Sequence, residues 1–143
     1  METLDYYKII RNSVQLLDVK LEHLECNNYG YKRGEKPEIN LKIQRKTKIM
    51  NEKQVKISLQ VVLDFEENAP FHFKVIYSGV CEAMKELEEE EFEQYAYEQV
   101  VPLLLPYVRE CITNTLSRMK LPIFYLPTID VLETIKVNSS HQE

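Results

Sequence analysis

The stretch QVKISLQVVLDFEENAPFHFKVIYSGVCEA, residues 54–83, decides the fold. Apolar side chains occupy every second position on both sides of a short turn at residues 66–70. Successive side chains of a β-strand point to opposite faces, so this alternation predicts strands over 54–65 and 71–83, each with one apolar and one polar face. Because the turn between them is short, the two strands should be antiparallel neighbours.

The alternation extends toward the N-terminus. Residues 38–50 form another predicted strand, which a compact turn at 51–53 joins to the next one, so that three strands make a meander. Residues 14–26 also alternate, but Leu16 and Leu24 interrupt the pattern and indicate a bulge or a twist in this first strand. Two rows of this strand are expected on opposite faces: Leu17, Val19 and Leu21 on one, Asp18, Lys20 and Glu22 on the other.

A helical pattern follows the strands. It begins in a glutamate run at residues 86–93, which is typical of a solvated helix start, with attraction of basic partners as the alternative. Proline lacks an amide hydrogen and crowds the preceding turn, so Pro102 should kink or end this helix, and a second helix should begin near it. The apolar arc of the second helix should pack on the apolar face of the sheet. Its members are Leu104, Leu105, Val108, Cys111, Ile112, Thr115, Leu116 and Met119.

Length and composition favour a single soluble domain spanning residues 1–143, with 1–12 as an N-terminal extension and 138–143 as a disordered tail. The net charge of −5 and the lack of a basic stripe argue against nucleic acid. No apolar run approaches the ~20 residues of a membrane helix, and no secretory signal is evident. Three widely spaced cysteines indicate a reducing compartment, so a cytoplasmic location is expected.

The residues that chemistry needs do not converge. The histidines, His23, His72 and His141, have no metal-ligand spacing to cysteine or carboxylate, and His72, on the polar face of its strand, is expected to be exposed. Neither a glycine-rich phosphate loop nor a serine elbow is present. We therefore expect no enzyme, no metal and no cofactor.

Surplus apolar side chains remain in the loops. They are Tyr29, Tyr31, Phe124, Tyr125 and Leu126, and they either close over the core or form an interaction site. A separate stripe beside the apolar arc of the second helix is either exposed or in contact with another subunit. Its members are Tyr107, Asn114 and Arg118.

At PYVRECI, residues 106–112, the chain resembles the SecB family of bacterial export chaperones. The step Leu121-Pro122, the strand segment LLDVKLE at 16–22 and Gly79-Val80 are similar to family positions as well. The resemblance covers roughly residues 9–137. It implies an α+β fold in which a long helix and a short C-terminal helix, here expected from Ile129 to Lys136, pack on a four-stranded antiparallel sheet with a crossed-over loop.

The resemblance also implies an ATP-independent chaperone, a holdase that binds unfolded or export-bound polypeptides in long apolar grooves. Its members assemble as homotetramers, dimers of dimers, which would make Tyr107, Asn114 and Arg118 an oligomer interface. The expected client-binding residues are Tyr29, Tyr31, Phe124, Tyr125, Leu126, Ile129 and Leu132.

Family members hand clients to the SecA motor, which docks on the polar face of the sheet. Asp18 and Glu22 match acidic docking positions of the first strand, whereas His72 and Lys74 stand where the fourth strand should carry an apolar residue and an acid. Like charges at a charged interface disfavour a partner, so this face leaves a second reading open. Some SecB-like proteins serve instead as chaperones of the antitoxin in a toxin–antitoxin pair, without SecA.

Overall fold

A computed structural model describes residues 14–31, 38–67 and 69–121 of the chain. It contains the strands β1 (Val14–Asn28), β2 (Ile39–Asn51), β3 (Gln54–Phe65) and β4 (Phe71–Ala83), followed by the helix α2 (Glu89–Arg118). The predicted α+β class is confirmed, and the four strands lie within two residues of their expected bounds. The expected N-terminal extension, the short C-terminal helix and the tail lie outside the described residues.

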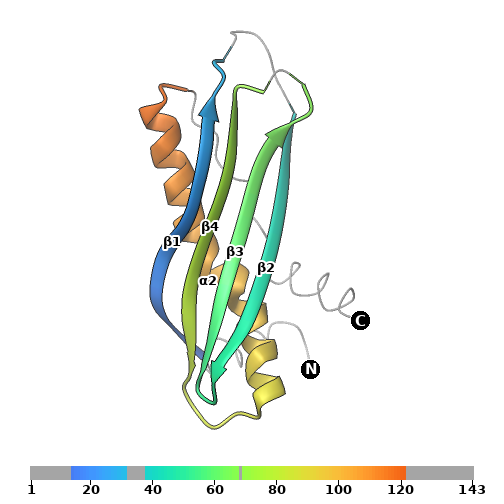
Figure 1. The fold of residues 1–143 in the computed structure, drawn as a ribbon, viewed down its shortest axis with the longest axis vertical. Coiled ribbons are helices and arrows are strands. Elements are labelled where there is room, and N and C mark those ends of the chain that lie inside the picture. The colour runs from blue at the N-terminus through green and yellow to red at the C-terminus, as the bar shows by residue number, and fades with distance from the viewer. Residues whose placement is uncertain (1–13, 32–37, 68, 122–143) are drawn as a thin grey trace.

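The four strands form one antiparallel sheet in the order β1-β4-β3-β2 (Figure 1). β2, β3 and β4 are the predicted meander. β1 pairs with the far side of β4, so the chain crosses from one edge of the sheet to the other between β1 and β2. This confirms the crossed-over connection that the family resemblance implies, and it makes β1 and β2 the two edge strands.

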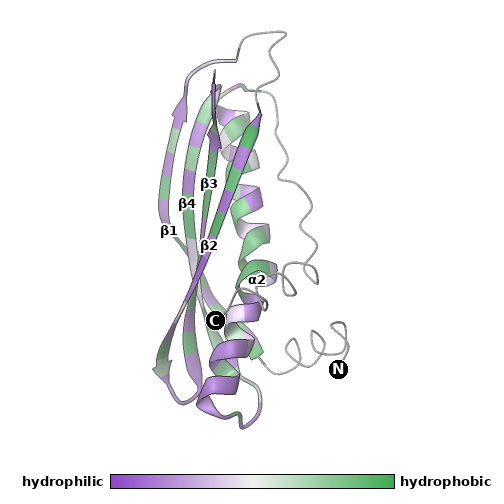
Figure 2. Ribbon diagram, turned by 90° about the vertical axis from the view of Figure 1, so that its right-hand side faces the viewer, coloured by the Kyte–Doolittle hydropathy of each residue, from purple (hydrophilic) through white to green (hydrophobic). Residues whose placement is uncertain are grey.

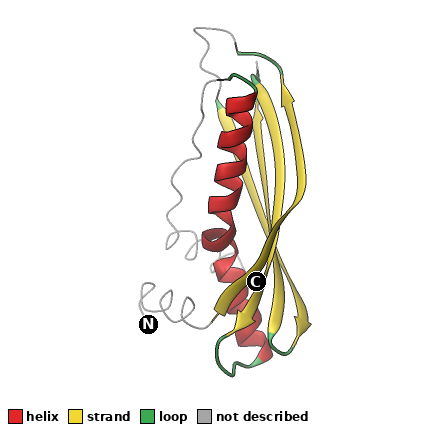
Figure 3. Cartoon of the chain, turned by 90° about the vertical axis from the view of Figure 1, so that its left-hand side faces the viewer, coloured by secondary structure: helices red, strands yellow, loops and turns green. Residues whose placement is uncertain are grey.

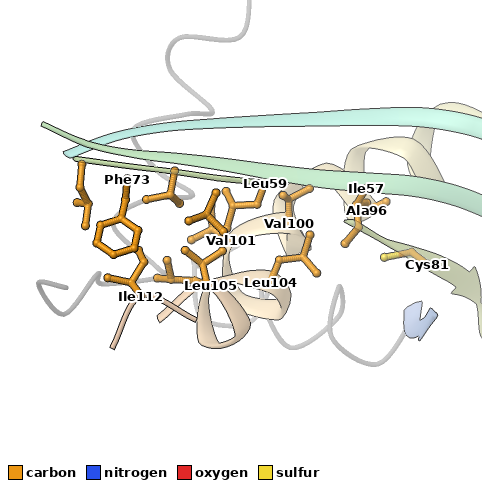
Figure 4. Close-up of a cluster of buried hydrophobic side chains, with 14 of the residues drawn as sticks. Ile57, Leu59, Phe73, Cys81, Ala96, Val100, Val101, Leu104, Leu105 and Ile112 are labelled. Carbon is orange, nitrogen blue, oxygen red and sulfur yellow. The ribbon is translucent and has the colours of Figure 1, made fainter. Parts of the chain in front are cut away.

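One face of the sheet is apolar and α2 covers it (Figure 2). In β3 the inward row is at most 1% exposed, and the alternate residues are partly exposed. Figure 4 shows Ile57, Leu59 and Phe73 of the sheet facing Val100, Leu104 and Ile112 of the helix. Burying each large apolar side chain is worth ~1.5–3 kcal/mol, so this shared row fixes the helix on the sheet.

A single helix of 30 residues runs through both Pro102 and Pro106, so the expected second helix near Pro102 is wrong. Each interior proline costs about 3 kcal/mol relative to alanine. The buried side of the helix, however, continues without interruption across the prolines from Phe92 to Leu116, and this burial outweighs the cost. The alternative expectation, a kink, agrees with the change of direction along the helix in Figure 3.

The predicted irregularity of β1 is present, and it corrects one row assignment. The register with β4 shifts between Leu17 and Lys20, where Asp18 has a positive φ of 50°, and again between Leu21 and His23. Each extra residue exchanges the faces of the residues after it. Leu17 and Leu21 therefore lie on opposite faces, since Leu17 pairs with Val80 on the outer face and Leu21 pairs with Tyr77 on the inner one. Leu16, opposite Cys81, packs against the core.

Candidate functional site

The outer face of the sheet carries a charged cluster around Glu22. Its carboxylate accepts a 2.6 Å hydrogen bond from the hydroxyl of Ser78, which is 1% exposed, and Lys20 and Lys56 lie 3.6 and 3.5 Å away. The Ser78 hydrogen bond, followed by the two ammonium groups, lowers the pKa of Glu22. Of the two expected acidic docking residues, Asp18 is exposed at the bulge, but Glu22 has its charge balanced by two lysines.

The lowered pKa of Glu22 gives a testable pH dependence. A carboxyl group with a folded-state pKa below its unfolded value of 4.5 stabilises the fold above that pH, and the contribution is lost as pH falls through the folded pKa. Ser78→Ala removes the largest cause, so its melting temperature should fall less steeply than that of the wild type between about pH 5 and about pH 3. Thermal unfolding by circular dichroism across this window measures both slopes. Equal slopes would contradict the assignment.

His72 and Lys74 lie on the same face but farther along β4. His72 was expected to be exposed, and this is wrong in part. Its side chain is only 25% exposed, and its ring Nδ1 lies 2.6 Å from the Asp64 carboxylate. Lys74 stands opposite Glu25 of β1. At ~3.3 Å per residue, His72 lies about 20 Å along the strand from Ser78, the partner of Glu22. Glu22, His72 and Lys74 therefore share a face without forming one cluster, and Asp18 lies in the bulge, where the β1–β4 register gives it no partner.

Tyr29 and Tyr31, expected to bind clients, follow β1 directly. Their exposed fractions are 62% and 39%. The segment is anchored at its start, since the Tyr29 amide donates to the Pro70 carbonyl at 2.9 Å, and the Asn28 side-chain amide donates to the Met119 carbonyl at 3.1 Å. Tyr29 is thereby held near the C-terminal end of α2. The other expected client-binding residues lie outside the described residues, namely Phe124, Tyr125, Leu126, Ile129 and Leu132.

An exposed apolar surface lies where α2 leaves the inner row of β1 uncovered. We call it the β1 patch: Leu21 (43% exposed), Leu24 (39%), Tyr107 (40%) and the half-buried Tyr77, whose ring centroid is 6.0 Å from that of Tyr107. Of the expected interface residues, Tyr107 belongs to this patch, and Asn114 and Arg118 are exposed farther along the helix. The sequence placed Leu21 on an apolar row but gave no sign that the row would stay uncovered.

A buried polar cluster between β2 and α2 was missed by sequence reasoning. Arg45 and Glu98 have side chains 5% and 0% exposed, with 3.8 Å between Nη1 and a carboxylate oxygen. Arg45 also donates to the Tyr97 carbonyl at 3.1 Å and stacks on the Tyr97 ring, 3.9 Å from its centroid, while Gln94 donates to Glu98 at 2.8 Å. The first turns of α2 are solvated as expected, but Glu98 is not. The one available signal was Arg45 on an otherwise apolar alternate row.

Beside this cluster is a cleft of about 500 Å³ between the end of β2 and the first turns of α2. Its walls carry three carboxylates and the ring of Tyr97. The lining residues are Thr47, Ile49, Glu89, Glu90, Glu93, Gln94 and Tyr97.

The described residues offer no metal site and no membrane-spanning helix. Among them no group of three or more histidine, cysteine, aspartate or glutamate side chains could hold a metal ion. No helix in the described part of the chain is long and apolar enough to cross a membrane. Burial raises the pKa of the Cys81 thiol to about 12 and is also the main reason that the Cys111 pKa is raised, so neither thiol is a ready nucleophile.

Comparisons with known proteins agree on one family. The family model of SecB, described as preprotein translocase subunit SecB, matches residues 8–139. A curated relative, the protein-export protein SecB of Orientia tsutsugamushi (strain Ikeda), is 24% identical over 142 residues, covering 95% of this chain and 86% of the relative.

Two solved structures share the fold. A SecB-like chaperone of Mycobacterium tuberculosis, in complex with a peptide from the HigA1 antitoxin, aligns with a TM-score of 0.72 at 14% identity, covering 90% of this chain and 100% of that one. A protein of unknown function from Streptococcus agalactiae aligns with a TM-score of 0.56 at 16% identity, covering 80% of this chain and 97% of the other.

Proposed function

The chain belongs to the SecB family and is a SecB-family chaperone, and from this premise we propose that it holds unfolded polypeptides in apolar grooves without ATP. The main support for the proposal is that aromatic side chains are exposed at a point where a hydrogen bond anchors the backbone. Tyr29 and Tyr31 are exposed, although the backbone at Tyr29 is fixed to the Pro70 carbonyl. Apolar side chains on an anchored backbone can cover apolar segments of a client with less loss of backbone freedom than side chains on a free loop.

The second candidate is a dedicated chaperone of an antitoxin, uncoupled from SecA. Two observations favour it over export. Lys20 and Lys56 balance the charge of Glu22, and Lys74 replaces an acid, so the outer face lacks most of the free acidic charge expected at SecA-docking positions. The structural neighbour from M. tuberculosis was solved with an antitoxin peptide. Neighbouring genes discriminate, because a toxin–antitoxin pair alongside favours the dedicated role and an isolated gene favours general holding.

We further propose a homotetramer, a dimer of dimers, located in the cytoplasm and without enzymatic activity. The β1 patch supports an assembly, because Leu21, Leu24 and Tyr107 leave apolar surface exposed beside an edge strand. Tyr107, Asn114 and Arg118 are the residues proposed to contact the neighbouring subunits. Light scattering after size exclusion tests the assembly, and a monomer at micromolar concentration would contradict it.

Client binding is tested by replacing the two aromatic residues proposed to line the groove. The double variant Phe124→Ser, Tyr125→Ser should retain much less denatured client in a pull-down. Two large apolar contacts are lost, and the small polar side chain of serine should keep the variant itself soluble. Met84→Ser is the matched control, since Met84 is 57% exposed in the connection between β4 and α2 and should leave the yield unchanged. Full client yield with the double variant would show that the groove lies elsewhere.

A further inference from the structure

β2 has one edge that pairs with β3 and another that pairs with nothing in the described part of the chain (Figure 1). An edge strand presents alternate amide and carbonyl groups that can pair with an added strand. β2 is 13 residues long, so an extended segment of about ten residues, roughly 33 Å, would fit along it. The side chains of β2 decide which segment fits.

The outward row of β2 is basic, and its one acidic neighbour across the β2–β3 pair, Asp64 opposite Asn40, is already in contact with His72 at 2.6 Å. Lys42, Lys46 and Lys48 are all exposed. Across the β2–β3 pair they face Val62, Ser58 and Lys56, and among the described residues none of the three lysines forms an ion pair. Lys48 lies opposite Lys56, and the Glu22 carboxylate that offsets this like-charge pair is 3.5 Å from Lys56 and forms no ion pair with Lys48.

The inward row of β2 is different and changes along the strand. It begins with the half-buried Ile39, Leu41 and Ile43. It ends at Thr47 and Ile49, in the cleft whose other wall carries Glu89, Glu90 and Glu93. Figure 2 shows the hydrophilic first turns of α2 beside this end of the sheet. The neighbouring Arg45 and Glu98 balance each other, so the three glutamates leave the cleft negative.

We propose that the free edge of β2 selects a polypeptide segment by charge. The segment is extended, and its alternate residues face opposite sides of the sheet. On the outer side it carries acidic residues, which lie over the lysine row. On the inner side it carries apolar residues followed by a basic one, which enters the acidic cleft. The inference rests on the proposed function, since it specifies which polypeptides the chain holds. Complementary charge on both faces of the added strand, together with main-chain pairing, is its physical basis.

Two kinds of synthetic peptide test the selection with the full-length protein. The first peptide alternates Glu with Leu, except that Arg replaces Leu at one end. It is made in two versions, one with the Arg residues at the N-terminus and one with them at the C-terminus. The second exchanges Glu and Arg, keeping length and apolar content. In one orientation the first peptide should bind about tenfold more tightly than its exchanged form by fluorescence anisotropy, and the difference should shrink in high salt. Equal affinities in both orientations would overturn the proposal.

Protein variants locate the binding. Lys46→Glu should weaken the first peptide about fivefold, and adding Lys48→Glu should weaken it further. Lys20→Glu is the matched control, because Lys20 is exposed on the outer face of the opposite edge strand, and its effect should stay within about twofold. Equal weakening by Lys46→Glu and Lys20→Glu would mean a diffuse charge effect and would overturn the assignment to β2.

Backbone pairing has its own readout. A peptide with N-methyl groups on one set of alternate amides should lose binding, and the peptide methylated on the other set should keep it, since only one set faces β2. Equal behaviour of the two overturns strand addition. Exchange of the β2 amides that point away from β3 should be fast in the free protein and slow with peptide. The β2 amides bonded to β3 serve as the internal reference. If exchange of the outward amides is already slow without peptide, a second copy or another segment of the chain occupies the edge, and the proposal fails.

The same preparations are tested with a denatured model protein. If the wild type binds denatured protein and shows no preference between the peptides, the charge selection is wrong and the proposed function stands. If it binds neither, both are wrong.

Discussion

Glu98→Ala should lower the free energy of unfolding by about 3–5 kcal/mol, because it leaves the Arg45 guanidinium buried without its carboxylate. The Arg45 side chain is 5% exposed, and the Tyr97 carbonyl and ring cannot neutralise its charge. Urea unfolding followed by circular dichroism, at one fixed protein concentration, measures the loss.

Two further variants isolate the mechanism. Arg45→Met combined with Glu98→Leu removes both charges and should recover most of the loss, as buried ion pairs replaced by apolar residues often do. Glu93→Ala, which changes a partly exposed carboxylate one turn earlier, should stay within about 0.5 kcal/mol of the wild type. If Glu98→Ala is no less stable than Glu93→Ala, the buried pair does not hold α2 against β2.

Phe73→Ala should cost a similar amount, about 3–5 kcal/mol, through the cavity it opens. Phe73 is 0% exposed, faces α2, and makes an edge contact with Phe71 at 5.4 Å between ring centroids. The same unfolding experiment measures the cost. Met84→Ala, at an exposed apolar residue, should change stability by less than about 0.5 kcal/mol. A similarly small loss of stability for Phe73→Ala would show that neighbouring side chains fill the cavity and that Phe73 is not needed to hold α2 on the sheet.

The sequence was sufficient for whatever depends on local periodicity. The alternating apolar row from Val55 to Leu63 was enough to predict that these residues are buried, because a sheet face covered by a helix is excluded from solvent. The helix arc from Leu104 to Met119 likewise lies on the sheet as predicted. The crossing from β1 to β2 depends on strand order, which periodicity does not contain, and only the family resemblance implied it.

Contacts between distant residues could not be predicted in this way. Glu98 lies five residues after the glutamate run, and nothing in its local sequence distinguishes it from those solvated acids. Only its contact with Arg45, 53 positions earlier in the sequence, explains its burial. Leu17 lay on the wrong predicted face because a bulge changes the count by one residue. The continuous helix through Pro102 could not be predicted from the local cost of proline in a helix alone, because that cost is offset by apolar residues buried on both sides of it.

Two kinds of surface support the two proposals, the holding of clients and their selection by charge. Exposed aromatic residues such as Tyr29 supply apolar contact without readout of sequence, whereas the lysine row and the acidic cleft flanking β2 add a charge preference. Many weak contacts along an extended client give affinity without a deep pocket.

The most direct measurement is aggregation of a chemically denatured model protein, followed by light scattering, with the purified chain and no nucleotide. The proposed function predicts that scattering falls as the chain is added, reaches a minimum near a fixed ratio of chaperone to client, and does not change when ATP is supplied. Unchanged aggregation at a large excess of folded chain would contradict it.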